Sequence, residues 1–534
     1  MTLTRRTTLL IVFSFCAVLE GLLCVWFQGP KPVLSAATES DSGDGRFSSE
    51  RACELHAQIF PDEPHPAGAE SNELVRHRIE THLKSMGWKV DDPTPGDAPK
   101  NIVAAHPDLV DLSQRPLILV SHYDSCPQGP GAGDAGGCVV AVLEAARILT
   151  SGSDQLRRPI WVLLTDAEET GLNGARHFCE THPLRNQNPI VLNFDARGNA
   201  GPVVMFETHN GNLEMIDRFV NQLARPRLTG SLFTTIYRML PNDTDFTVFS
   251  RAGFEGFNFA LIDGAWNYHR PTDTLANLDR RSVQHLGQTA VSLATAIATT
   301  ENDVQPSSAD ALFLDLLGLH VLVVPRTWML PLRFAILFLG VQLYGRPLMK
   351  NRQWKSVLTV WGTMALLLPF AALLGWIVSR SLIGTQILPR AFVPHGHWLS
   401  LGMWVFCIEC CCQLSMLLLR KVDQRCLWNS FWLAHAFTTM VVATFAAEFS
   451  YLLWLPALIA IAATLLLPET LVRTVIVSVL CCLLLIPLHH LMAIGLGPAA
   501  GMFLFPAFAL LVMPLLPCLG KMDVTNSATV SEVT

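Results

Sequence analysis

The spacing of hydrophobic and polar positions divides the chain into two parts. Up to about residue 305, short apolar runs alternate with segments of helical periodicity, whereas residues 329–519 form a series of long apolar blocks. The short runs are NIVAAH, PLILVSH, PIWVLLTD, PIVLNFD, PVVMFET and GFNFALID, and the helical patterns span 67–86, 136–150, 171–182, 211–224 and 279–300. This alternation predicts an α/β fold, an α/β/α sandwich around a largely parallel mixed sheet that is buried on both faces.

The long apolar blocks predict a membrane protein. Those that can cross about 30 Å of hydrocarbon as helices lie at about 8–27, 329–345, 356–378, 397–419, 427–447, 451–467, 474–494 and 499–518. The first block follows Arg5 and Arg6 and has no small-residue cleavage site at its end, so we interpret it as a signal anchor. The positive-inside rule then places residues 28–325 outside the cytoplasm.

The basic residues of the remaining loops agree with this topology. The loops predicted to be cytoplasmic carry Arg346, Lys350, Arg352, Lys355, Arg420, Lys421, Arg425, Arg473 and Lys521, whereas the outer loops carry Arg380 and Arg390. The expected organisation is an anchor at 1–30, a linker at 31–48, a globular domain at 49–305, a connector at 306–328, an all-α polytopic membrane domain of about seven helices at 329–520, and a cytoplasmic tail at 521–534. A lipid bilayer is therefore an expected partner.

The composition of the chain excludes some classes of function and scaffold. The net charge is −6, and no basic stripe interleaved with aromatic residues occurs, so a nucleic-acid partner is not expected. Four of the 14 cysteines, Cys53, Cys126, Cys138 and Cys179, lie in the globular part, which is too few for a disulfide-built scaffold but leaves one or two bridges open. The cluster of Cys407 and Cys410 to Cys412 lies inside an apolar block, where we interpret it as packing. The sequence does not determine the oligomeric state.

Polar side chains gather where the predicted strands end. A single acid at a strand end is commonly a turn or cap residue, but several such ends of a parallel sheet meet in one crevice. The residues at these ends are His122, Asp124, Asp166, Glu168, Glu169, Asp195, Tyr268, His269 and Asp273. So many carboxylates in one place favour a divalent cation, and a mixed His/Asp/Glu set suits Zn²⁺ better than Mg²⁺ or Ca²⁺.

The order of these residues resembles a known family. It runs H-x-D, a Gly-rich loop ending in Asp, Glu-Glu before Thr-Gly-Leu, a strand-end acid, and Y-H-x-x-x-D-T. This order is similar to that of the co-catalytic di-zinc exopeptidases, such as bacterial leucyl aminopeptidase, over about residues 49–302. The phrases ARGNAGPVVMFET and TDFTVFSRAGFEGFNFA, together with the apolar tail, resemble the membrane-anchored branch that includes endoplasmic reticulum metallopeptidase.

The resemblance implies two Zn²⁺ ions per chain. Asp134 would bridge them, with His122 and Asp195 completing one site and Glu169 and His269 the other. The Gly-rich loop would bend tightly to bring Asp134 back beside His122.

The resemblance also implies roles for the neighbouring residues. Glu168 would act as the general base. Asp124 is placed to accept a hydrogen bond from the second imidazole nitrogen of His122, and Asp273 is expected to do the same for His269.

Three further residues have weaker assignments. Tyr268 would donate to the oxyanion or serve as a buried structural tyrosine. Arg197 would orient a substrate carboxylate or form an ordinary salt bridge. Asp245 is expected to line the substrate pocket.

The leading hypothesis is a membrane-anchored di-zinc metallopeptidase, an aminopeptidase-like exopeptidase acting on peptides outside the cytoplasm. The alternatives are a non-catalytic scaffold or receptor ectodomain of the same fold, and a single-zinc enzyme that resembles glutaminyl cyclase. Aminopeptidase and carboxypeptidase activity both stay open. The compartment is open too: a bacterial plasma membrane with a periplasmic domain, or an endoplasmic reticulum membrane with a lumenal domain.

Overall fold

A computed structural model of the chain describes residues 46–519, except 93–95, 97, 109–113, 152–154, 224–229, 304, 306, 317, 395 and 468–469, together with Val18 and Leu22. The chain forms two compact units, one over Gln28–Arg326 and one that contains Thr327–Thr534. The predicted signal anchor, most of the linker and the cytoplasmic tail lie outside the described residues.

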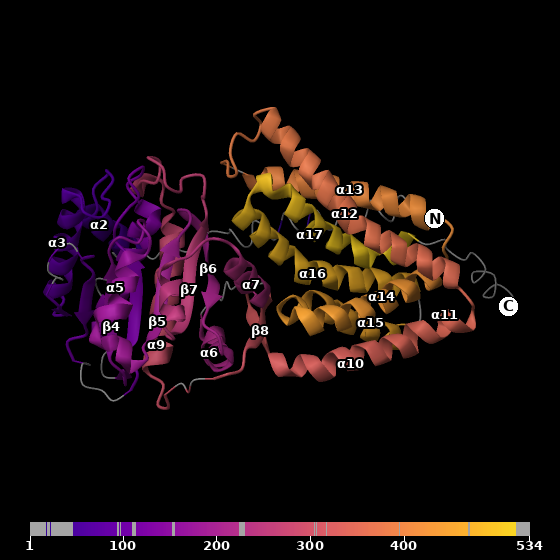
Figure 1. The fold of residues 1–534 in the computed structure, drawn as a ribbon, viewed down its shortest axis with the longest axis horizontal. Helices are drawn as coiled ribbons and strands as arrows, with labels where there is room; N and C mark the ends of the chain where they lie inside the picture. Colours follow the sequence, from indigo (N-terminus) through magenta and orange to yellow (C-terminus); the bar gives the residue numbers. More distant parts are fainter. Residues whose placement is uncertain are drawn as a thin grey trace, which may run out of the picture. The chain divides into compact units, whose positions relative to one another are not determined.

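The first unit is built on one seven-stranded sheet (Figure 1). Its strands are β1 Lys89–Val90, β2 Ile102–Ala105, β3 Leu117–His122, β4 Ile160–Thr165, β5 Ile190–Ala196, β6 Ala200–Thr208 and β7 Glu255–Asp263, in the order β1-β2-β4-β3-β5-β7-β6. The four central strands, β4, β3, β5 and β7, are parallel, and the outer pairings are antiparallel. The predicted fold class is confirmed, with the parallel part confined to the centre. β6 runs against β5 because residues 197–199 are too few for the crossover that a parallel connection requires.

Helices cover both faces of the sheet, as the apolar strands require. Along β3, Leu117 and Leu119 join one core, while Ile118 and Val120 join the other, since successive strand residues point to opposite faces. The first core also contains residues of α2 Ser49–Ile59, α3 Glu70–Ser85, α4 Cys138–Ser151 and α9 Arg280–Ala298, and the second contains residues of α5 Asn173–Thr181 and α8 Asp245–Arg251. The result is a three-layered sandwich.

Some elements were not expected from the sequence. The pattern did not indicate α2, α8, the helix α7 Ser231–Met239, or the antiparallel hairpin of β8 Ala311–Leu316 and β9 His320–Pro325. The predicted helix at 211–224 is the shorter α6 Leu213–Phe219 followed by a 3₁₀ turn at Val220–Gln222. The four cysteines of this unit are free thiols, so neither of the bridges left open by the sequence forms here.

The second unit consists of helices. They are α10 Met329–Gly340, α11 Arg346–Lys350, α12 Trp354–Gly384, α13 Gly396–Leu419, α14 Gln424–Phe445, α15 Tyr451–Leu466, α16 Thr470–Leu496 and α17 Gly501–Val512, with short π and 3₁₀ segments between some of them. Helical structure occupies all the blocks predicted between 329 and 518. Among the described residues, however, 4 helical segments are long and apolar enough to cross a membrane: Arg326–Lys350, Trp354–Gly384, Gly396–Leu419 and Val472–Leu496. Tyr451–Leu466 and Pro498–Leu510 are apolar but shorter.

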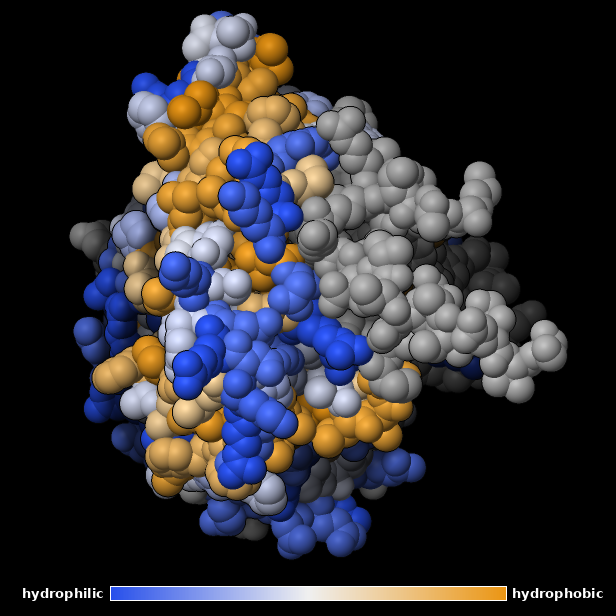
Figure 2. All heavy atoms as spheres, turned by 90° about the vertical axis from the view of Figure 1, so that its right-hand side faces the viewer, coloured by the Kyte–Doolittle hydropathy of each residue, from blue (hydrophilic) through white to orange (hydrophobic). Residues whose placement is uncertain are grey.

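Hydrophilic side chains gather at the end of the helical unit where α11 lies, bordered by hydrophobic ones (Figure 2). This end includes the exposed residues Arg346, Lys350, Arg352 and Lys355, which belong to a loop predicted to be cytoplasmic. The cysteine cluster of α13 gains no further ligand: among the described residues, the His/Cys/Asp/Glu groups that could hold a metal all lie in the first unit.

Candidate metal centre

The central parallel strands carry their polar residues to one edge of the sheet. His122, the last residue of β3, pairs in register with Thr165, the last residue of β4. On the other side of β3, Val120 pairs with Asn193, so His122 and Asp195 each lie two residues beyond this pair on neighbouring strands. Parallel alignment therefore places the imidazole and the carboxylate next to each other.

A first group of donor atoms consists of His122, Asp134 and Asp195. The Nε2 atom of His122 lies 3.3 Å from Oδ1 of Asp134 and 3.5 Å from Oδ1 of Asp195. All three side chains are buried, and their donor atoms lie within 4.8 Å of one another. This is the set that the resemblance implied for one zinc ion.

A second group lies on the other side of Asp134. The Nε2 atom of His269 is 3.2 Å from Oδ2 of Asp134 and 3.0 Å from Oε2 of Glu169. Cys126 joins this group, because its Sγ and the donor atoms of Glu169 and His269 lie within 4.8 Å of one another. Asp134 thus presents one oxygen to each histidine.

The donor atoms of both groups fit a metal centre. Nε2 of His122, Oδ2 of Asp134, Oε1 of Glu169 and Nε2 of His269 are buried, and apart from the contacts within the two groups none has a hydrogen-bond partner among the described residues. Buried polar atoms without partners are costly in a folded protein unless something else satisfies them. Imidazole nitrogens and carboxylate oxygens are the donors that Zn²⁺ takes in catalytic sites, so these residues fit zinc.

The Gly-rich loop holds Asp134 in place. Gly131 has a left-handed backbone with φ of 66°, and a Cβ there would come within 2.5 Å of the Asp134 carbonyl oxygen. Asp273 anchors the same loop at three successive amides: its main-chain oxygen accepts from Ala132 (3.1 Å), and its carboxylate accepts from Gly133 (2.9 Å) and Asp134 (3.2 Å). Asp273 therefore supports Asp134, whereas the sequence analysis assigned it to His269.

Asp124 also acts through atoms other than those expected. The main-chain oxygen of Asp124 accepts the hydrogen bond from Nδ1 of His122 at 3.0 Å, while its carboxylate oxygen is 3.6 Å from that nitrogen. The carboxylate instead accepts the backbone N–H groups of Glu168 at 3.1 Å and Glu169 at 3.3 Å. A single residue thus orients His122 and fixes the turn that carries both glutamates.

The two adjacent glutamates face different neighbours. Glu169 reaches His269, as the 3.0 Å contact shows. Burial raises the pKa of Glu168 well above its ordinary value; the charges of Asp195, Asp245 and Asp134 act in the same direction, and His122 opposes them. Ala167, directly before the pair, has a left-handed backbone with φ of 57°, which only a well-determined turn sustains.

The three residues with weaker assignments lie around the centre. Tyr268 stacks on His269, with ring centroids 3.8 Å apart, and burial together with the nearby carboxylates raises the pKa of its phenol. Asp245 is buried and accepts a hydrogen bond from Thr165; burial raises the pKa of its carboxyl to about 7, and the charge of Asp195 contributes. Arg197 follows β5, and its backbone N–H donates to Leu261 at 2.8 Å.

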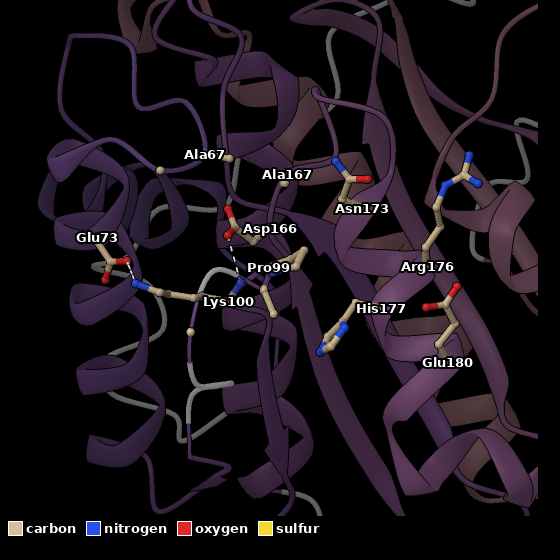
Figure 3. A pocket seen from close by; sticks show the side chains of 13 residues that line it. Ala67, Glu73, Pro99, Lys100, Asp166, Ala167, Asn173, Arg176, His177 and Glu180 are labelled. Carbon is tan, nitrogen blue, oxygen red and sulfur yellow. Dashed lines mark hydrogen bonds and ion pairs between the residues drawn. The ribbon is translucent and has the colours of Figure 1, made fainter.

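Asp166 belongs to a polar cavity beside the glutamate turn. Its carboxylate accepts hydrogen bonds from the Asn72 side chain at 2.9 Å and from the Lys100 backbone at 3.0 Å. The Lys100 ammonium pairs with Glu73 on the same wall (Figure 3). The cavity has a volume of about 810 Å³ and reaches the start of α5. Asp166 thus lines this cavity and joins neither group of metal donors.

Cys126 and a pair of buried histidines behind the loop were not among the predicted site residues. Burial lowers the pKa values of His56 and His65 to about 4. Burial also raises the pKa of the Cys126 thiol to about 11, and the charges of Glu169 and Asp134 contribute to this rise. The one signal for Cys126 in the sequence is its place four residues after His122, on the loop that leaves β3.

Comparison with known proteins agrees with this geometry. Residues 101–294 match the model of peptidase family M28. Endoplasmic reticulum metallopeptidase 1 of Homo sapiens is 26% identical over 240 residues, which are 44% of this chain and 26% of that protein. The vacuolar membrane protease of Candida dubliniensis is 26% identical over 300 residues, 54% of this chain and 31% of that protein. The match thus spans less than a third of either relative's length.

The crystal structure of the LapA aminopeptidase of Legionella pneumophila aligns with a TM-score of 0.39 and 16% identity, over 51% of this chain and 78% of that one. An overlap this low carries no argument about the site. The family match, by contrast, includes both groups of metal donors, from His122 to His269. It confirms the predicted resemblance to zinc peptidases: the chain contains a domain of peptidase family M28.

Proposed function

We propose that the protein is a membrane-anchored metallopeptidase that binds two Zn²⁺ ions and removes terminal residues from peptides outside the cytoplasm, as an aminopeptidase. One observation carries the proposal. The buried carboxylate of Asp134 lies between two histidines, with Oδ1 3.3 Å from Nε2 of His122 and Oδ2 3.2 Å from Nε2 of His269. One carboxylate with a separate histidine at each oxygen can be shared by a pair of metal ions, each with its own histidine.

Glu168 is the proposed general base. When bound, two zinc ions would act as Lewis acids and lower the pKa of a water molecule. Glu168 then takes the proton of the attacking water and delivers it to the leaving amine. Burial raises the pKa of Glu168, and this direction suits a carboxylate that takes up a proton and later delivers it.

The surroundings of the base fit a hydrolase. The Asp124 carboxylate holds the backbone of Glu168 and Glu169, so the base and the metal donor keep separate directions. The Tyr268 phenol, which lies among the same carboxylates, is placed to donate a hydrogen bond to the carbonyl oxygen of a bound peptide. The polar cavity lined by Asp166 and Lys100 is the proposed approach for the peptide.

The location outside the cytoplasm rests on the basic loop residues. The hydrophilic end of the helical unit carries Arg346, Lys350, Arg352 and Lys355, which the positive-inside rule assigns to the cytoplasm (Figure 2). The globular domain precedes the first of these helices in the chain, and we place it on the opposite side.

The test uses the full chain, purified in detergent. Zinc content and hydrolysis of a panel of aminoacyl chromogenic substrates are measured for the wild type, for Glu168→Gln and for Glu54→Gln, a control at an exposed position of α2. We expect two zinc ions per chain in all three proteins, and a fall in kcat of about 10²–10⁴-fold in Glu168→Gln alone.

The other outcomes separate the alternatives. One zinc ion per chain, with cyclisation of N-terminal glutamine, would favour the glutaminyl-cyclase hypothesis. Bound zinc without turnover of any terminal-residue substrate would contradict the aminopeptidase. A folded protein that binds no metal would favour the scaffold.

A further inference from the structure

Cys126 lies in a turn that packs against the segment of His269. The turn has the sequence Cys126-Pro127-Gln128-Gly129, and Cys126 is only 5% exposed. A Cβ at Gly129 would come within 2.2 Å of the Arg270 carbonyl oxygen, so only glycine allows this approach. The turn is therefore pressed against the residue that follows His269.

The surroundings of Sγ combine two backbone amides with two carboxylates. The backbone amides of Gln128 and Gly129 interact with the sulfur atom, and the charges of Glu169 and Asp134 act on it. Two buried carboxylates beside a sulfur atom favour a cation at this place.

The distances allow one ion to reach all the donors. Sγ of Cys126 and the donor atoms of Glu169 and His269 lie within 4.8 Å of one another. In a tetrahedral zinc site, a Zn–S bond of about 2.3 Å and a Zn–N bond of about 2.1 Å place the two donor atoms about 3.6 Å apart. Side-chain rotations that close at most about 1.2 Å therefore bring these donors to a common ion.

A second observation points to a ligand at this place. The Glu169 side chain is 8% exposed, and its Oε1 atom is buried without a hydrogen-bond partner among the described residues. Nε2 of His269 lies 3.0 Å from Oε2, the other oxygen of the same carboxylate. Cys126 thus belongs to a cluster of unsatisfied donors and is not an isolated buried thiol.

We propose that Cys126 is a thiolate ligand of the metal ion held by Glu169, His269 and Asp134. The proposal rests on metal binding as proposed above and adds a fourth protein donor. A metal-bound thiol is deprotonated outright, so the sulfur would bind as a thiolate.

The two sites of the pair then differ. Cys126, Glu169, His269 and Asp134 offer four donors, the number of a closed tetrahedral zinc site. His122, Asp195 and the shared Asp134 offer three, the number of a zinc site with an open position. A sulfur donor would make the Cys126 group prefer softer cations than the His122 group.

The test is zinc X-ray absorption on the full chain loaded with two zinc ions, compared with Cys126→Ser and with the matched control Cys179→Ser. Cys179 is a free thiol of α5 that belongs to neither metal group. We expect a sulfur shell at about 2.3 Å, beside the nitrogen and oxygen shell at about 2.0–2.1 Å, in the wild type and the control, and no sulfur shell in Cys126→Ser.

Two further readouts do not depend on activity. With Cd²⁺ in place of zinc, a sulfur-to-cadmium charge-transfer band should appear in the wild type and the control and be absent from Cys126→Ser. The weaker zinc ion should also dissociate more readily from Cys126→Ser, by at least the roughly tenfold that loss of an outer hydrogen-bond partner costs.

The outcomes distinguish this proposal from the proposed function. Two bound zinc ions without a sulfur shell, or a sulfur shell that persists in Cys126→Ser, would overturn the role of Cys126 and leave the di-zinc peptidase intact. A wild-type protein that binds no zinc would overturn both.

Discussion

Asp273 offers a direct test of how the Gly-rich loop is held. Its carboxylate is 2% exposed and accepts the amides of Gly133 at 2.9 Å and Asp134 at 3.2 Å. Replacing Asp273 by Ala removes both acceptors but keeps the main-chain bond from Ala132. Hydrogen bonds to charged groups contribute about 1.5–3 kcal/mol each, so the bound position of Asp134 loses about 3 kcal/mol or more.

The loss of these hydrogen bonds should lower the affinity of the protein for zinc. Burial raises the pKa of the Asp273 carboxyl to about 7, with the Asp134 charge acting in the same direction. We therefore take about 1.5 kcal/mol, the lower end of the range, for each of the two hydrogen bonds. At 1.36 kcal/mol per factor of ten, about 3 kcal/mol weakens zinc binding on the order of 100-fold. Competition with a chromophoric chelator measures this change in zinc affinity.

The matched control is Asp279→Ala. Asp279 also accepts a backbone amide, that of Arg281 at 2.9 Å, but it caps α9 and does not contact the loop. It should lose about 1 kcal/mol of stability and no zinc affinity. If Asp273→Ala binds zinc as tightly as the wild type while remaining folded, the loop does not depend on these amides and the argument fails.

Two further predictions concern stability. Burial raises the pKa of Asp245 from its ordinary value of 3.8 to about 7, so in the metal-free protein this carboxyl favours the folded state below about pH 4, and that contribution is lost as the pH rises through 7. In the presence of chelator, Asp245→Asn should therefore melt at a higher temperature than the wild type at pH 8, and by a smaller margin at pH 5. Equal melting of the two proteins at both pH values would show that the carboxyl is not buried in its charged form. Gly287→Ala should lower the free energy of unfolding by about 1–3 kcal/mol although alanine favours helices, because the new Cβ would lie 2.0 Å from ring atoms of Phe47. Denaturant unfolding measures this change, with Ser292→Ala on the same helix as the control. A gain in stability would refute the predicted clash.

Local patterning is enough to predict the class of fold and the edge of the sheet where the chemistry gathers. Apolar runs of strand length, separated by helical patterns, indicate parallel central strands, and parallel strands end at one edge. The pattern alone therefore groups His122 with Asp195. The order of motifs implies Asp134, Glu169 and His269 as well, and the fold brings all five together.

In the helical unit, the sequence predicts the positions of the helices better than their lengths. Hydropathy located every block between 329 and 518, and four helical segments of the described residues are long and apolar enough to span a membrane. α14 Gln424–Phe445 carries Asn429 and His435 within its length, and α15 and α17 are shorter, which distinguishes these helices from the four.

The atoms that support the centre follow from tertiary packing alone. Asp124 holds the amide of Glu168 across 44 positions of the chain, and Asp273 holds that of Gly133 across 140. Cys126 likewise meets Glu169 and His269 only because three separate loops converge. Periodicity reports which face of an element is buried, whereas such contacts depend on how distant loops pack, which no local pattern encodes.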